Sequence, residues 1–393
     1  MNTRPKIPRS VLILGFVALA SGFGQDLISS VLPAYLSLLA FSRADIGLID
    51  GLLQGATNIF RFVSGWLSDR TRSRKNLAFI GYVLSSITRP LLALASTFFP
   101  IAALRIIDGV GKGVKDAPRD ALVADAVSSE ISGRAFGFHR MIDTAGSVLG
   151  PLLAFGLLTA LLPSLATYRF IFALAAIPGA TALCLIWFGV REPIKKTQQI
   201  LAAAPALPWR FWMFTGAMAI ATLMKINDSL FLVRAQTLGV SATDIPLLFG
   251  CFTLIYAALS YPIGILSDRI GKMPLIAAGW LVLAVVEFGF SIDPGLPMTL
   301  VLFAGYGLFF ALTEGSGRAF IADTVASSGR GFAYGVYFTV LGVALIAGGF
   351  LLGKIWDQQT PEIAFRLAAI GSVIGGAALF AIHHHSPSPQ QTA

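Results

Sequence analysis

The chain has 393 residues, of which 55% are hydrophobic and only 12% are charged. Charged residues make up about 25% of an ordinary soluble domain, so the composition excludes a soluble enzyme, a disordered protein and a nucleic-acid-binding module. A net charge of +9 on so apolar a chain instead fits the rule that Lys and Arg gather in cytoplasmic loops. Cys184 and Cys251 both lie within apolar runs, which indicates neither a disulfide framework nor a metal cluster.

Apolar stretches recur along the whole chain, and a membrane-spanning helix needs about 20 mainly apolar residues. Lipid does not tolerate unpaired backbone groups, so these stretches must be helical. We predict spans at residues 11–38, 45–68, 76–97, 99–125, 135–161, 168–190, 209–238, 244–267, 274–292, 297–323, 331–353 and 363–382. The expected fold class is an all-α polytopic membrane protein with about twelve transmembrane helices.

The Lys and Arg residues divide unequally between alternate connecting segments. If the N-terminus is cytoplasmic, the opposite side receives only Arg43, Arg169, Arg234, Lys354 and Arg366. This bias predicts that both termini are cytoplasmic. We expect a multi-pass monomer in the lipid bilayer of a bacterial-type cytoplasmic (inner) membrane.

The longest polar gap, residues 191–208, holds Glu192-Pro193, two lysines and two further prolines. Its position near the middle predicts a cytoplasmic linker between a six-helix bundle at 1–190 and a second at 209–382. Residues 383–393 are rich in Ser, Pro and Gln, which is typical of a disordered tail. The run His383–His385 within that tail is assigned no role.

The two halves share short motifs in the same order. The repeated segments are Gly65–Arg70 with Gly264–Arg269, Ala121–Asp125 with Ala319–Asp323, Gly133–Phe136 with Gly329–Phe332, and Ser42–Ile46 with Ser241–Ile245. Six helices return the chain to the side where it started, so both copies have the same orientation. The pattern predicts two bundles related by a pseudo-two-fold axis along the membrane normal, an arrangement suited to alternating access.

The segment Gly65–Lys75 resembles the loop motif Gly-x-x-x-Asp-Arg-x-Gly-Arg/Lys-Arg/Lys of the major facilitator superfamily, from which Arg72 and Ser73 depart. Its second copy, Gly264–Lys272, fits the motif until it departs at Met273-Pro274. The resemblance implies a twelve-helix fold, a central cavity between the bundles and a rocking-bundle cycle.

Two further segments resemble the same superfamily. Residues Arg105–Gly113 resemble its Arg-x-x-Gln-Gly-x-Gly pattern, with Asp108 in place of Gln. Gly146, Gly150 and Pro151 resemble the Gly-x-x-x-Gly-Pro signature of its antiporters, although the closing glycine pair is missing. This likeness implies export, and the glycines and proline also suit close helix packing and a bend.

The predicted fourth helix carries an unusual stripe of charge. Spacings of three and four place Arg105, Asp108, Lys112, Lys115 and Arg119 on one face. Charge at membrane depth normally faces protein or a water-filled cavity. We interpret Arg105, Asp108 and Lys112 as residues of the substrate cavity and of proton coupling. We interpret the cytoplasmic end of the stripe as structural or as part of a gate. The alternative is an ion-pair network that serves packing alone.

Asp26 lies midway along the first predicted helix. A carboxyl group in an apolar setting holds its proton more readily, so Asp26 is a candidate proton carrier. The alternative is that it pairs with an arginine such as Arg89.

In the second half, Lys225 and Asp228 lie one turn apart on the seventh helix, and Glu314 and Arg318 one turn apart on the tenth. Both pairs have the spacing of ion pairs, which makes them candidates for the cavity or for internal salt bridges.

The gating residues implied by the resemblance lie in the two loop motifs. They are Gly65, Asp69, Arg70 and Arg74 in the first copy and Gly264, Asp268 and Arg269 in the second. By resemblance, the motif acid bonds to the eleventh helix, and the motif bases pair with an acid ending the fourth helix, here Asp125, whose repeat mate is Asp323. A lock that exists in one conformation only would bias a two-state equilibrium.

No P-loop and no hydrolase, kinase or metalloenzyme pattern is found in the sequence, so we expect a protein that is not an enzyme and needs no cofactor or bound metal. The favoured function is a proton-coupled exporter, an antiporter of a small molecule. The alternatives are an organic-anion uptake symporter or facilitator, a metal-ion exporter, and a non-transporting membrane sensor.

Overall fold

The computed structural model describes residues 8–70, 73–127, 132–190, 192, 206–326 and 329–384. The side chains of residues 69, 70, 132, 133, 383 and 384 are not part of this description. Most of the predicted linker and nearly all of the predicted tail lie outside the described residues, the backbone of 383 and 384 being helical. Within these ranges all regular structure is helical, which confirms the all-α fold class.

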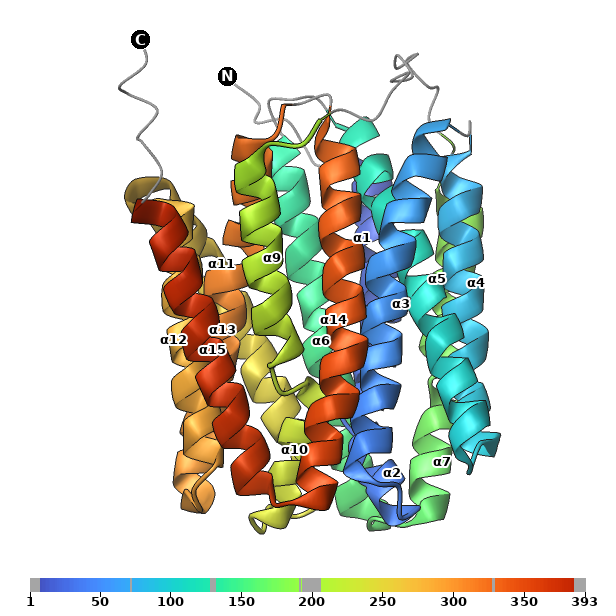
Figure 1. Ribbon diagram of the computed structural model, residues 1–393. Coiled ribbons are helices and arrows are strands. Elements are labelled where there is room, and N and C mark those ends of the chain that lie inside the picture. Colours follow the sequence, from blue (N-terminus) through green and yellow to red (C-terminus); the bar gives the residue numbers. More distant parts are fainter. Residues whose placement is uncertain are drawn as a thin grey trace, which may run out of the picture. The chain divides into compact units, whose positions relative to one another are not determined.

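The first half of the chain folds into long helices joined by short turns (Figure 1). They are α1 (Arg9–Ser29), α2 (Leu32–Leu38), α3 (Arg43–Arg70), α4 (Arg74–Leu91), η1 (Leu92–Leu94), α5 (Phe98–Asp125), α6 (Ser132–Leu161), α7 (Leu165–Leu174), α8 (Ala176–Cys184) and η3 (Leu185–Gly189).

The second half is built in the same way. Its helices are α9 (Trp209–Leu223), α10 (Asp228–Thr237), α11 (Ile245–Ile270), α12 (Lys272–Phe290), α13 (Gly295–Thr324), α14 (Arg330–Gln358) and α15 (Pro361–His384).

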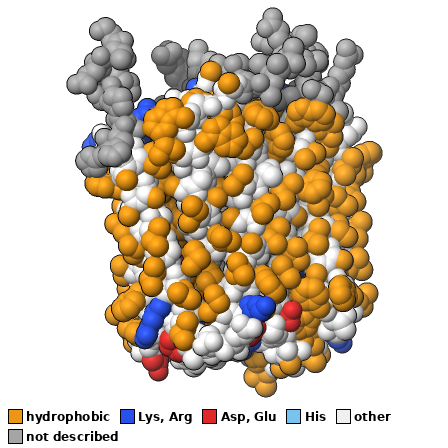
Figure 2. Space-filling view, viewed as in Figure 1, with side chains coloured by type: hydrophobic (Ala, Val, Ile, Leu, Met, Phe, Trp, Pro, Cys, Tyr) orange, Lys and Arg blue, Asp and Glu red, His pale blue; other side chains and the backbone are white. Residues whose placement is uncertain are grey.

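Among the described residues, ten helical stretches are long and apolar enough to cross a membrane. Of the twelve predicted spans, only α3 and α5 are missing from these ten; each has 28 residues, and charged side chains interrupt their apolar runs. On the face seen in Figure 2, hydrophobic side chains cover most of the described surface, and charged ones are sparse and lie near its ends. Large apolar side chains such as Phe99 and Phe188 are more than four-fifths exposed. The chain is therefore a polytopic membrane protein whose outer surface suits lipid.

Four predicted spans are not single continuous α-helices. The third passes from α4 into the short 3-10 helix η1 at Leu92. The first is interrupted between α1 and α2, where Pro33 lies in the first turn of α2 and has no backbone N–H for the preceding turn. The sixth changes from α7 to α8 at Ala175, three residues before Pro178. The seventh is interrupted between Leu223 and Asp228. Hydropathy finds the apolar length of a span but does not register such breaks.

The helices group into two compact units. The first unit takes the described residues as far as 192, except for residues 42–51, and also takes residues 241–250. The second unit takes residues 42–51 and the rest of the second half. The first residues of α3 thus belong to the second unit, and the first residues of α11 belong to the first unit.

Helix packing inside each unit repeats. In the first unit α1 runs along α6 and α4 along α5; in the second, α9 runs along α14 and α12 along α13. Close approach of neighbouring backbones repeats too. A Cβ atom added at Gly109 would lie 2.5 Å from the Leu53 carbonyl oxygen, and one added at the equivalent Gly307 would lie 2.5 Å from the Phe252 carbonyl oxygen. The contacts therefore extend the sequence repeat to the helices between the motifs.

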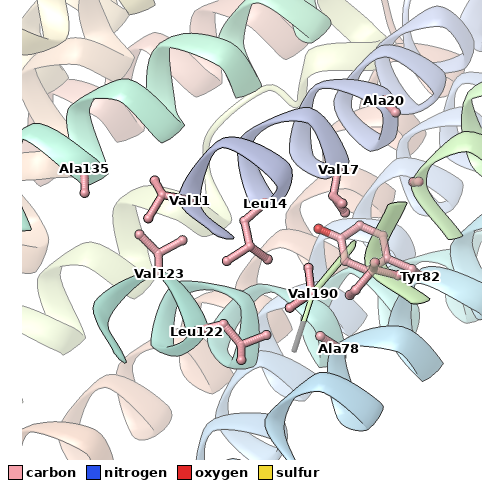
Figure 3. Close-up of a cluster of buried hydrophobic side chains, with 12 residues drawn as sticks. Val11, Leu14, Val17, Ala20, Ala78, Tyr82, Leu122, Val123, Ala135 and Val190 are labelled. Carbon is pink, nitrogen blue, oxygen red and sulfur yellow. The ribbon is translucent and has the colours of Figure 1, made fainter. Parts of the chain in front are cut away.

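A cluster of buried apolar side chains holds one end of the first unit together (Figure 3). Val11, Leu14 and Val17 of α1 face Val123 of α5 and Tyr82 of α4. This packing fixes α1 beside the helices that carry the buried charges described below.

Replacing Gly150 by Ala tests the contact between α6 and α1. An added Cβ would lie 2.5 Å from the Phe23 carbonyl oxygen and 2.7 Å from the Leu27 nitrogen, so α1 and α6 would have to separate. We expect Gly150→Ala to destabilise the protein by about 1–3 kcal/mol in detergent-induced unfolding. Gly156→Ala on the same helix is the control, because its Cβ meets no atom within 4 Å. Equal stability of the two variants would contradict the close contact.

Candidate functional site

The charged stripe on α5 is partnered along most of its length. Asp108 lies between two guanidinium groups, with Arg89 Nε of α4 at 3.3 Å and Arg105 Nη1 at 3.7 Å. All three side chains are buried. Since each cation balances the carboxylate, the group has the character of a fixed ion-pair cluster.

The next turns of α5 continue the network toward the other helices. Lys115 Nζ donates to Ser21 Oγ of α1 at 2.6 Å and lies 4.9 Å above the Tyr82 ring. Asp116 accepts a hydrogen bond from Arg61 Nη2 of α3 at 2.7 Å. Lys112, in contrast, is half-buried and has no ion pair within 4.0 Å among the described residues. The stripe therefore mixes fixed pairs with one lysine in a looser setting.

Asp26 has a different environment from Asp108. Its carboxylate accepts hydrogen bonds from the Gln25 amide, at 3.4 Å, and from the Ser147 hydroxyl of α6. Lys112 and Arg89 act on Asp26 only through longer-range attraction. The Arg89 guanidinium is engaged by Asp108, by the Ser21 carbonyl oxygen and, at 3.4 Å, by the Gln25 amide oxygen. The described residues thus give Asp26 neutral hydrogen-bond donors and no direct ion pair.

The antiporter-like segment lies against this carboxyl group. Ser147 falls between Gly146 and Gly150, and the backbone of Gly150 approaches α1 from Phe23 to Leu27, the turn that contains Asp26. The glycines of the segment allow the two helices to touch, and this contact places a hydroxyl on the buried acid.

The second unit brings Lys225 and Asp228 together with a residue that the sequence analysis missed. Lys225 Nζ lies 3.0 Å from Tyr306 Oη and 3.8 Å from Asp228 Oδ1, and Tyr306 donates a short hydrogen bond to Asp228. Tyr306 was detectable only by aligning the two halves, because it occupies the position that Asp108 has in the first half.

Glu314 and Arg318 form the predicted pair one turn apart on α13. Glu314 also accepts a hydrogen bond from Tyr256 of α11. Both charged side chains are partly exposed, so this pair stands apart from the fully buried groups.

The loop motifs end in ion pairs. Arg74 pairs with Asp125 at the end of α5, and Lys272 lies 3.0 Å from Asp323 and 3.7 Å from Asp268. The base that meets Asp323 is thus Lys272, whereas Arg269 is exposed. The side chains of Asp69 and Arg70 lie outside the described residues, and Gly65 and Gly264 have room for a Cβ.

Glu192 is a further residue that sequence reasoning treated only as part of the linker. Its carboxylate accepts the backbone N–H groups of Arg74, at 2.6 Å, and Lys75, at 2.9 Å. A carboxylate there satisfies donors at the first turn of α4 and opposes the positive end of the helix dipole. Arg74 therefore binds an acid through its backbone and another through its side chain.

No group of three or more His, Cys, Asp or Glu suited to a metal ion occurs in the part of the chain that the structure describes.

Two helical units with repeated packing, an apolar outer surface and polar clusters buried on membrane helices define a membrane transporter fold. The profile of the Major Facilitator Superfamily matches residues 14–230 and 211–393. The chain belongs to this superfamily, as the sequence motifs indicated.

Known proteins of similar sequence span almost the whole chain. An uncharacterized MFS-type transporter of Methanocaldococcus jannaschii is 29% identical over 385 residues, covering 96% of each chain. The quinolone resistance protein NorA of Staphylococcus aureus is 22% identical, covering 95% of this chain and 96% of its own. A crystal structure of a mutant of the nucleoside transporter NupG has a TM-score of 0.79 at 16% identity, covering 95% of this chain and 99% of that one. This last likeness concerns the fold.

The two buried acids of the first unit predict stability losses of different size on neutralisation. Asp108→Asn leaves Arg89 and Arg105 buried beside a neutral group, which we expect to cost about 3–5 kcal/mol of stability. Asp26→Asn keeps an oxygen for the Ser147 hydroxyl and breaks no ion pair, so its cost should be about 1 kcal/mol.

Unfolding of both variants in mixed micelles measures this difference. Equal destabilisation would contradict the distinction between a fixed ion pair and a carboxyl group held by neutral donors.

Proposed function

We propose that the protein is a proton-coupled exporter, an antiporter that moves a small molecule out of the cytoplasm by alternating access. The observation that carries the proposal is the setting of Asp26 on α1. It is a buried carboxyl group held by Gln25 and Ser147, and it lies where the antiporter-like segment of α6 contacts α1. Gaining or losing a proton there breaks no direct ion pair, so the group can be loaded and unloaded within a cycle.

Asp108 is the weaker candidate for proton coupling. Protonating it would leave Arg89 and Arg105 without their counter-charge, a costly state for buried groups. We therefore assign coupling to Asp26, and structural balance to Asp108 and Arg105.

The gates are proposed at the ends of the loop motifs. Arg74–Asp125 in the first unit and Lys272–Asp323 in the second are ion pairs at equivalent places in the repeat. A pair that forms in one conformation and opens in the other would shift the balance between the two states.

The relative NorA supports both the direction and the choice of a test molecule. Its name assigns it to quinolone resistance, and it aligns along almost all of this chain. A quinolone such as norfloxacin carries both an acidic and a basic group, which suits a protein whose buried clusters contain both signs of charge. We use norfloxacin as the probe for export.

Neutralising Asp26 should uncouple transport. In proteoliposomes, we expect Asp26→Asn to reduce norfloxacin movement against its gradient, driven by protons, to the level of empty vesicles. Counterflow exchange, which needs no proton gradient, should persist because the substrate site is intact. The matched control is Asp293→Asn, an exposed carboxyl group in the turn between α12 and α13.

Proton-driven pumping by Asp26→Asn at the wild-type ratio would refute the assignment. If the wild-type protein instead moves norfloxacin in the same direction as protons, the protein is a symporter.

The orientation proposed for the membrane has its own test. Reporters fused at Lys195 and at the C-terminus should both be active on the cytoplasmic side, and one near Arg43 on the outside, because Lys and Arg favour cytoplasmic loops. Alkaline phosphatase and fluorescent-protein fusions read the two sides. A C-terminal reporter on the outside would break the even number of crossings that a parallel repeat needs.

A further inference from the structure

The seventh span is broken inside the second unit, at residues 224–227 between α9 and α10. A break at membrane depth exposes backbone groups that lipid cannot satisfy, so protein groups must do so. Lys225 Nζ donates to the Ile226 carbonyl oxygen at 3.1 Å, and Asn227 Oδ1 accepts the N–H of Leu230 at 3.2 Å. Asn227 Nδ2 also donates to the Gly47 carbonyl oxygen at 2.9 Å.

The N–H of Ile226 is satisfied by Glu287 of α12, a side chain with no exposed surface. Glu287 Oε1 accepts this N–H at 3.0 Å, and Oε2 accepts the Ser372 hydroxyl of α15 at 2.6 Å. One carboxylate thus joins the broken span to two other helices. No ion pair within 4.0 Å of Glu287 occurs in the described parts of the chain.

The residues on either side of Ile226 belong to the polar cluster of this unit. Lys225 precedes it, Asp228 follows it by two, and both contact Tyr306. Lys225 also exerts a longer-range attraction on Glu287. Backbone hydrogen bonds tie the N–H groups of Met224 and Lys225 to the last turn of α9, whereas the N–H of Ile226 goes to Glu287. The course of the chain beyond Lys225 therefore depends on the side chains that hold it.

The first unit has an equivalent contact with the opposite polarity. Aligned through Gly81 and Gly279, Arg89 occupies the position of Glu287. Arg89 donates to a backbone carbonyl oxygen of α1, that of Ser21, at 2.9 Å, whereas Glu287 accepts a backbone N–H of the span equivalent to α1.

The charges they face are reversed as well. Counting back from Ser42 and Ser241 aligns Asp26 with Lys225. At longer range, Arg89 is therefore attracted by an acid and Glu287 by a base. In both units a buried charged side chain of the third span, on α4 or on α12, therefore bonds to the backbone of the first span of that unit.

We propose that Glu287 is a positioning residue: it holds the break at Ile226 and so sets where Lys225 and Asp228 present their charges to a charged group of the transported molecule. This inference rests on the proposed export function. It assigns the second unit to substrate binding, and it leaves proton coupling with Asp26 of the first unit. Loss of Glu287 should then weaken substrate affinity and leave the ratio of protons to substrate unchanged.

Hydrogen exchange reads the contact without any transport. In Glu287→Ala the amide of Ile226 should exchange about tenfold faster, because its acceptor is gone. Glu287→Gln retains a carbonyl oxygen for this amide and should exchange as the wild type does. Ser372→Ala is the matched control, because it removes the other partner of the carboxylate and leaves the Ile226 contact in place.

Norfloxacin transport in proteoliposomes reads the consequence. We expect Glu287→Ala to raise KM about tenfold with a similar kcat and an unchanged proton ratio, and Glu287→Gln to restore KM. A wild-type KM in Glu287→Ala overturns the inference, and so does a changed proton ratio in that variant. It is also overturned if Glu287→Gln shows wild-type exchange at Ile226 but has the raised KM of Glu287→Ala. If Glu287→Ala does not assemble, the inference rests on the Gln variant, and a tenfold higher KM there with normal exchange refutes it.

Failure of the export function is a separate result. It would appear as absence of proton-driven norfloxacin movement in the wild-type protein, and exchange at Ile226 would still decide whether Glu287 holds the break. Unchanged exchange in Glu287→Ala overturns the inference whatever the protein transports.

Discussion

The cost of burying charge inside membrane helices governs how each unit is put together. In the first unit, Asp108 is balanced by Arg89 and Arg105, and Asp116 by Arg61. These contacts join α3, α4 and α5 in a geometry that apolar packing alone would not specify, because lipid solvates apolar faces as well as a neighbouring helix does. The helices must keep this register for their charges to remain paired.

Against that background, Asp26 stands out by its partners. It lies within the same buried region, yet its hydrogen bonds come from the neutral groups of Gln25 and Ser147. The contact between Gly150 and α1 keeps Ser147 in place, so a packing feature and a polar feature are one arrangement. A group whose charge is not required by a direct partner is the one that can change its protonation in a cycle.

The second unit reuses the same helix packing with different polar groups. Lys225, Glu287 and Tyr306 stand where the first unit has Asp26, Arg89 and Asp108. The exchange of signs means that neither unit repeats the chemistry of the other. In both units, however, a charged side chain of the third span, Arg89 of α4 or Glu287 of α12, bonds to the backbone of the first span. Such a division is consistent with the proposal that one unit carries protons and the other binds a charged molecule.

The sequence by itself determined the fold class, the repeat, the superfamily and the ten stretches that are apolar enough to cross a membrane. The length and hydropathy of a span follow from the thickness of a membrane. It also predicted the pairs Arg74–Asp125, Lys225–Asp228 and Glu314–Arg318, which depend on helical spacing or on the family's loop motif.

Only the tertiary structure decided that Arg89 serves Asp108 rather than Asp26, that Glu192 caps α4, and that Glu287 meets Ile226 at a break in the seventh span. These contacts join residues on different helices, and a periodic pattern along one helix carries no information about which neighbour its polar face meets. Where several buried charges could pair with the same partner, the distances between the side chains in the folded protein decide which ion pairs form.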